Sequence, residues 1–142
     1  MKLVFEIGDW VSVGGQPVQV YAVHKNKIAY HVGNDKTKPV KWVFINVVTP
    51  LIVTPYMFEN NGFKCIASHE VKLNDKVIGT TPDKFMYKDD TQYISVTRFD
   101  DRWNVIHVYH DGCQPTNSVM VKYAHELQHA LRLFGIDKKI QL

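Results

Sequence analysis

Short runs of β-branched and aromatic residues alternate with turn residues through the first fifty positions of the chain. Gly14-Gly15 lies between the first and second runs, and Lys25-Asn26-Lys27 lies between the second and third. A polar loop precedes the fourth run. The runs cover residues 10–13, 18–23, 28–32 and 40–48. Strands of this length and spacing are typical of a small curled sheet. The pattern therefore predicts a small SH3-like β-barrel module over residues 1–50.

A second unit is predicted over residues 51–142, although one continuous domain also fits the pattern. Thr54-Pro55 is a helix start, and Asn60-Asn61-Gly62 is a helix stop, so residues 55–60 should form a short helix. A later strand is expected over residues 85–88, after a turn at Thr81-Pro82-Asp83.

Two β-rich runs, residues 93–99 and 103–109, are separated by Asp100-Asp101-Arg102, which has the length and polarity of a hairpin loop. We expect them to pair antiparallel. A three-residue loop and strand alternation then predict which side chains a helix would cover. These are Ile94, Val96, Ile106 and Val108, with Trp103, His107 and Tyr109 pointing the other way.

The covering helix is predicted from near Thr116 or Asn117 to Phe134, where Gly135 can end it and Ile136 can pack back on the last turn. Its apolar stripe is centred on Leu127. His125 and His129 fall on the opposite side, with Lys122 and Arg132, and are expected to be exposed to solvent. The predicted fold class is α+β: the SH3-like module, then an antiparallel sheet covered by one long C-terminal helix.

Within this helix, His125, Glu126 and His129 spell HExxH, the motif of zinc peptidases. Histidines four residues apart on a helix reach one metal ion, and the adjacent glutamate can polarise a bound water. A catalytic zinc also needs a third protein ligand. The thirteen residues after His129 contain no histidine or glutamate and one acid, Asp137.

Arg132 stands where the shorter zinc peptidase pattern has glycine, so a third ligand would have to come from His110 or Asp111. We therefore expect no metal, no cofactor and no catalytic residue. The alternative is a zinc-dependent hydrolase in which Glu126 is catalytic and His125 and His129 bind the metal.

The distribution of charge makes the first module a candidate for ligand binding. The first fifty residues carry six lysines and three acids, which accounts for the whole net charge of +3. Cations beside exposed aromatic rings are typical of single-stranded nucleic-acid binding. The alternative interpretation is that these lysines only solvate loops and protect sheet edges. The candidate partner-binding residues are Lys25, Lys27, Tyr30, Lys36, Lys38, Lys41 and Trp42.

The remaining features favour a cytoplasmic protein. Glu6 and Asp9 interrupt the first ten residues, which excludes the pattern of a signal peptide there. The longest apolar region, residues 42–58, is broken by polar and proline residues and is too short for a membrane span. Cys65 and Cys113 lack CxxC spacing, so free thiols are expected rather than a disulfide framework or a zinc site.

The segments TPYMFENNGF and VKYAHELQHALRLFGIDKKIQL resemble small uncharacterised proteins encoded by phages, prophages and mobile elements of gut bacteria. Those proteins have a short helix led by Thr-Pro and ended by Asn-Gly-Phe, then strands and a C-terminal helix with a His-[EQ]-Leu-Gln core. The matching residues here are Thr54, Pro55, Asn61, Gly62, Phe63, His125, Leu127 and Gln128.

In that group glutamine can stand in the place of Glu126, and the place of His129 is not always histidine, which a zinc peptidase would not tolerate. The resemblance implies that Leu127 is a core residue and that Gln128 bonds a neighbouring strand or loop. It carries over no activity, which weakens the enzyme interpretation and leaves the function open. Taken with the missing third ligand, it leads us to expect a non-catalytic binding or accessory protein of mobile-element origin. We expect a protein partner first and nucleic acid second, with no membrane.

Overall fold

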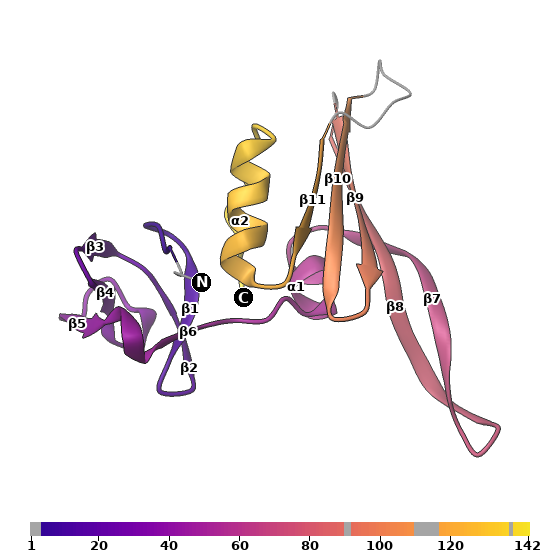
Figure 1. The fold of residues 1–142 in the computed structure, drawn as a ribbon, viewed down its shortest axis with the longest axis horizontal. Helices are drawn as coiled ribbons and strands as arrows, with labels where there is room; N and C mark the ends of the chain where they lie inside the picture. The colour runs from indigo at the N-terminus through magenta and orange to yellow at the C-terminus, as the bar shows by residue number, and fades with distance from the viewer. Residues whose placement is uncertain (1–3, 90–91, 110–116, 137) are drawn as a thin grey trace.

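The computed structural model describes residues 4–89, 92–109, 117–136 and 138–142 (Figure 1). The first fifty residues form two three-stranded antiparallel sheets, with strand orders β2-β1-β6 and β3-β4-β5. Their strands are β1 Trp10–Val13, β2 Gln16–Gln19, β3 Ala22–His24, β4 Lys27–His31, β5 Val40–Phe44 and β6 Val48–Pro50, with short 3-10 turns at Val32–Asn34 and Ile45–Val47. Both sheets are open, so the described residues do not show the closed SH3-like barrel that the sequence predicts.

The described residues after position 50 form a five-stranded antiparallel sheet with order β11-β10-β9-β8-β7, together with two helices. Its elements are α1 Pro55–Asn60, β7 Lys64–Leu73, β8 Lys76–Lys88, β9 Gln92–Phe99, β10 Arg102–Tyr109, β11 Asn117–Val121 and α2 Ala124–Leu133. The α+β class, the short helix α1 and the β9–β10 hairpin are confirmed.

The face of β10 that meets the core differs from the prediction. The hairpin loop has two residues, because Arg102 pairs with Phe99. The register is therefore one residue away from that of a three-residue loop, and a shift of one residue reverses the face of every side chain. Val105 now lies opposite Val96. Trp103, Val105 and His107 are buried with Ile94 and Val96, whereas Ile106 takes the other face.

Two predicted boundaries are also wrong. Asn117–Val121 is strand β11, which pairs with β10, so α2 begins only at Ala124; Thr116 lies outside the described residues. Thr81-Pro82-Asp83 is not a turn but part of the 13-residue strand β8. Proline is tolerated there because β9 pairs only with residues 84–88 of β8, which leaves one edge of the earlier part unpaired.

Strands β7 and β8 form a long hairpin that turns at Asn74 and Asp75, both with positive φ, a conformation that asparagine and aspartate tolerate well. Its outer half extends beyond β9 and projects away from the sheet, as Figure 1 shows. Ile66, Leu73, Val77 and Ile78 are exposed along this hairpin. Both faces of its outer half are therefore available to solvent.

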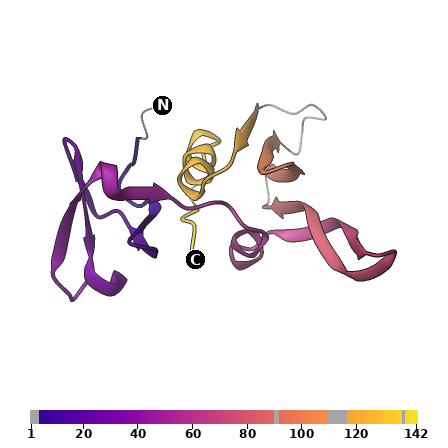
Figure 2. The same ribbon diagram turned by 60° about the horizontal axis from the view of Figure 1, so that its bottom comes forward.

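Helix α2 lies between the N-terminal strands and the five-stranded sheet (Figures 1 and 2). Leu127 and Leu131 are fully buried and belong to the hydrophobic cluster of the five-stranded sheet, so the predicted burial of Leu127 is confirmed. Gly135 ends the helix with φ +76°, and the Ile136 amide donates to the Leu131 carbonyl, as expected. Among the described residues, no helix is long and apolar enough to cross a bilayer.

A separate hydrophobic cluster fills the N-terminal part. Its members are Phe5, Val11, Val18, Val20, Ile28, Tyr30 and Val48. The second cluster begins at Val53, so the chain passes from one cluster to the other between Val48 and Val53. This crossing segment is held against the start of α2, because Val53 donates to the Lys122 carbonyl and Ala124 donates to the Leu51 carbonyl. The segment that joins the two clusters thus contacts the start of α2.

Candidate functional site

The HExxH glutamate, Glu126, lies in the first turn of α2. Its Oε1 accepts hydrogen bonds from the backbone amides of Lys122, at 2.9 Å, and Tyr123, at 3.0 Å. A helix start leaves backbone amides without intrahelical acceptors, and a glutamate at this position can satisfy them. The carboxylate of Glu126 therefore turns back toward the residues that precede the helix and stabilises the helix start.

The first histidine of the motif, His125, is 5% exposed, so the expectation of a solvent-facing side chain is wrong. Its ring packs edge-on against Phe5, with centroids 5.1 Å apart, and stacks with Tyr123 at 5.9 Å. Burial lowers the pKa of His125, with the Asp9 charge opposing, so the neutral imidazole is favoured. Its Nδ1 is buried and has no hydrogen-bond partner within the described part of the chain.

The second histidine, His129, is bound to Asp9, which lies at the other end of the sequence. Its Nε2 is 2.9 Å and 3.1 Å from the two carboxylate oxygens of Asp9. The Asp9 side chain is fully buried and also accepts a hydrogen bond from the Glu6 amide at 2.7 Å. Burial raises the pKa of Asp9, while the Glu6 amide and His129 oppose that shift by stabilising the carboxylate.

Arg132, one turn beyond the motif, completes this contact. Its guanidinium donates to the Glu6 carboxylate and, at 3.2 Å, to the Ile7 carbonyl. Residues 5–9 thus cover part of the face of α2 opposite Leu127, where His129 is partly buried and Arg132 stays exposed. A helical periodicity identifies an apolar stripe, but it does not show that a second part of the chain covers the polar face.

Gln128 fastens the C-terminal segment to α2. Its Nε2 donates to the Lys138 carbonyl at 2.8 Å, and its Oε1 accepts from the Ile140 amide at 2.7 Å. Asn61 makes a similar pair of bonds with the backbone of Gln141. The expectation that Gln128 bonds a neighbouring segment is confirmed.

Metal binding by HExxH requires a third ligand beside His125 and His129. Among the described residues, no group of three or more histidine, cysteine, aspartate or glutamate side chains is arranged to hold a metal ion. The two sequence candidates for a third ligand, His110 and Asp111, lie outside the described residues, as do Asp137 and Cys113. Cys65 is an exposed free thiol.

The candidate partner-binding residues do not all lie on the surface. Trp42 is 48% exposed, Lys27 is partly buried, and Lys25, Lys36, Lys38 and Lys41 are exposed. Tyr30 is only 9% exposed and belongs to the N-terminal hydrophobic cluster, so little of its ring is available to a partner. Sequence reasoning missed Phe44 and Tyr21, which are exposed. Strand alternation from Trp42 would have found Phe44, two residues away on the same face.

Comparison of the chain with protein-family models, with curated proteins and with solved structures finds no match.

Proposed function

We propose that the protein acts by binding rather than by catalysis, as an accessory protein of a mobile element, and that its HExxH helix joins the two parts of the fold. The observation that carries the proposal is the position of Glu126. In a zinc hydrolase this glutamate acts on the water bound to the metal. Here its Oε1 accepts two backbone amides at the helix start, which is a structural role.

Both histidines support the same interpretation. His125 is packed between Phe5 and Tyr123, and His129 is bonded to a buried carboxylate from the first module. Each ring makes contacts that hold α2 against residues 5–9. The mobile-element origin rests on the resemblance at Thr54-Pro55, at Asn61-Gly62-Phe63 and in the α2 motif.

Exposed apolar side chains support a binding role, because a monomer that exposes several large ones in one region commonly uses them for contact with a partner. They gather on the projecting β7–β8 hairpin and on the outer side of the N-terminal module. The zinc-dependent hydrolase with Glu126, His125 and His129 remains the competing function.

Two measurements on protein purified without an affinity tag separate the functions. Elemental analysis is expected to find no stoichiometric zinc. Glu126→Gln keeps a side-chain oxygen acceptor, so its free energy of unfolding in urea melts should be close to that of the parent. Glu126→Ala should lower the free energy of unfolding by about 0.5–2 kcal/mol, which is the usual cost of losing a helix cap. Glu70→Ala, at an exposed site, is the control. One zinc per chain that disappears in His129→Ala would refute the proposal.

A further inference from the structure

The sheet β3-β4-β5 has one face in the N-terminal core and one face outside it. Ile28 and Tyr30 belong to the core cluster, and Val43 packs against it. Strand alternation therefore places the neighbours of these residues along β4 and β5 on the outer face. The pairing Lys27 with Phe44, Ala29 with Trp42 and His24 with Lys27 sets these side chains beside one another.

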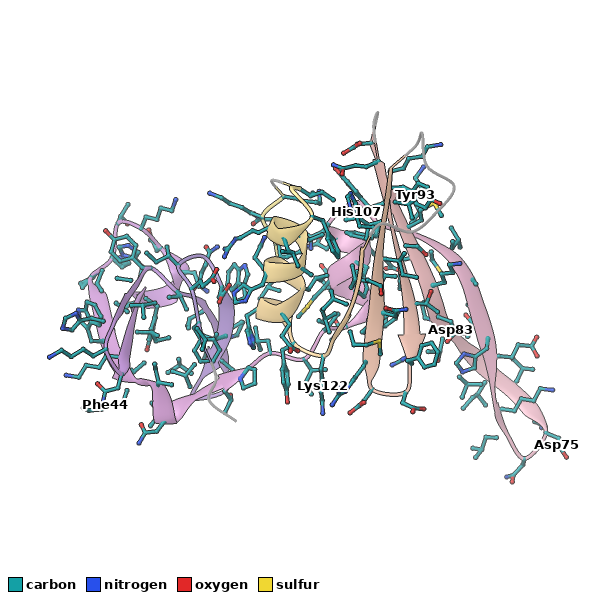
Figure 3. The ribbon with its side chains drawn as sticks, turned by 45° about the horizontal axis from the view of Figure 1, so that its top comes forward. Phe44, Asp75, Asp83, Tyr93, His107 and Lys122 are labelled. Atoms are coloured by element: carbon teal, nitrogen blue, oxygen red, sulfur yellow. The ribbon has the colours of Figure 1, made fainter. Side chains whose placement is uncertain are left out.

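We call this outer surface the aromatic face and define it by six residues. They are Tyr21, His24, Lys27, His31, Trp42 and Phe44. Three of its rings are well exposed, Tyr21 at 55%, Trp42 at 48% and Phe44 at 50%. Figure 3 shows Phe44 on the side of the module that faces away from α2. The Phe44 end of the face is therefore not used in the contact between the module and the helix, whereas Tyr21 and His31 lie nearer to it, beside Ile7, Gly8 and Lys139.

Cationic and aromatic groups are interleaved on this face. The Lys27 ammonium lies 4.7 Å from the centroid of the Phe44 ring. At the other end of β4, the rings of Tyr21 and His31 meet at 4.5 Å, and His31 Nδ1 lies 3.0 Å from the Lys38 carbonyl. Lysines thus flank the exposed rings at both ends, from the β3–β4 turn and from the loop before β5.

The charge around the aromatic face is predominantly positive. Residues 10–50 contain five lysines and one acid, Asp35, and Asp35 is bonded to Thr37. Glu6 and Asp9 are the other acids of the first fifty residues, and they are engaged with Arg132 and His129 on α2. A positively charged surface with exposed rings complements a ligand that has regularly spaced anions and flat apolar groups.

We propose that the aromatic face binds single-stranded nucleic acid. Bases stack on Trp42, Phe44 and Tyr21, and the lysines at the two ends of the face contact phosphates. Stacking on protein rings needs bases that are not stacked in a duplex, which selects single strands. This proposal deepens the binding role proposed above by naming the partner, and it does not depend on how Glu126 is used.

The test uses fluorescence anisotropy with labelled oligothymidine and oligouridine of twelve nucleotides, and with a DNA duplex of the same length. We expect micromolar dissociation constants for the single strands at low salt, with weaker binding of the duplex. The single strand that binds with the lower dissociation constant identifies DNA or RNA as the preferred ligand. Affinity should fall with salt with a slope of about −0.7 for each phosphate contact.

Variants test which surface is responsible. Phe44→Leu and Trp42→Leu keep apolar bulk but remove the ring, and each should weaken single-strand binding about fivefold or more. Lys27→Gln should reduce the salt slope. Matched controls come from the other half of the chain: Phe99→Leu, whose ring is 60% exposed, and Lys72→Gln should bind as the parent does. Thermal melts verify that every variant is folded.

Three results would overturn the inference. They are no binding of either single strand at low salt, equal binding of duplex and single strand, and equal affinities of the ring variants and the Phe99→Leu control. Absence of single-strand binding would exclude single-stranded nucleic acid as the ligand of the aromatic face. None of these results changes the Glu126 and zinc measurements, so failure of this inference is distinguishable from failure of the proposed function.

Discussion

The buried carboxylate of Asp9 lies 2.9 Å from Nε2 of His129, although 120 residues separate them in the sequence. Glu6 and Arg132 form a second, more exposed pair beside them. The HExxH helix is consequently packed on both sides, by the five-stranded sheet through Leu127 and by residues 5–9 through its two histidines. Its residues therefore affect stability on both faces.

Leu127 should be the most sensitive position of the helix. Truncation of a fully buried leucine removes apolar contacts and leaves a cavity, so Leu127→Ala should lower the free energy of unfolding by about 2–5 kcal/mol. Leu133, in the same helix, is 76% exposed, and Leu133→Ala should stay within about 0.5 kcal/mol of the parent. Urea melts compare the two. Similar losses in both variants would show that α2 is not packed as described.

Gln128 should control the order of the C-terminal segment. Gln128→Leu removes one donor and one acceptor and leaves the Ile140 amide and the Lys138 carbonyl without these partners. An unsatisfied buried group costs about 1–3 kcal/mol. We expect that loss in urea melts, together with faster hydrogen exchange at the Ile140 amide. Gln16→Leu, at an exposed site, is the control. Unchanged hydrogen exchange at the Ile140 amide would contradict the hydrogen bond between this amide and Gln128.

The pH dependence of stability should report the burial of His125. Because burial lowers its pKa below the ordinary 6.5, the unfolded chain binds a proton at this ring more readily than the folded chain does. Stability is therefore full above pH 6.5 and falls as the pH drops toward the folded pKa. His107, whose pKa burial also lowers, acts in the same direction.

His125→Leu should flatten part of the fall in unfolding free energy between about pH 7 and pH 5, while the slope that comes from His107 remains. Urea melts at several pH values measure the slope. Identical slopes in His125→Leu and the parent would show that His125 titrates as an exposed histidine does.

Local signals in the sequence identified several elements correctly. Thr54-Pro55 and the Asn60-Asn61-Gly62 stop gave the bounds of α1, and Gly135 gave the end of α2, because caps and stops depend on neighbouring residues alone. The β9–β10 pairing also followed from local composition. The register of this pair could not be predicted from local composition, because both strands carry apolar residues on both faces. A loop that is longer or shorter by one residue decides which face is buried.

The environment of the histidines could not be predicted for a different reason. His125 and His129 lie on the polar side of a helical wheel, and nothing in α2 itself indicates that Phe5 and Asp9 cover that side. The Glu-Ile-Gly-Asp segment near the start of the chain is the partner, and its pairing with α2 is a contact between distant parts of the sequence. Periodicity along one helix carries no information about such a contact.

A double-mutant cycle between Asp9 and His129, measured in urea melts with a metal chelator present, tests the structural role of the motif most directly. It compares the parent with Asp9→Ala, His129→Ala and the double variant. We predict a coupling energy of about 0.5–3 kcal/mol, unchanged when the chelator is replaced by zinc. A coupling near zero in chelator that appears only with zinc would contradict the account and favour the zinc-dependent hydrolase.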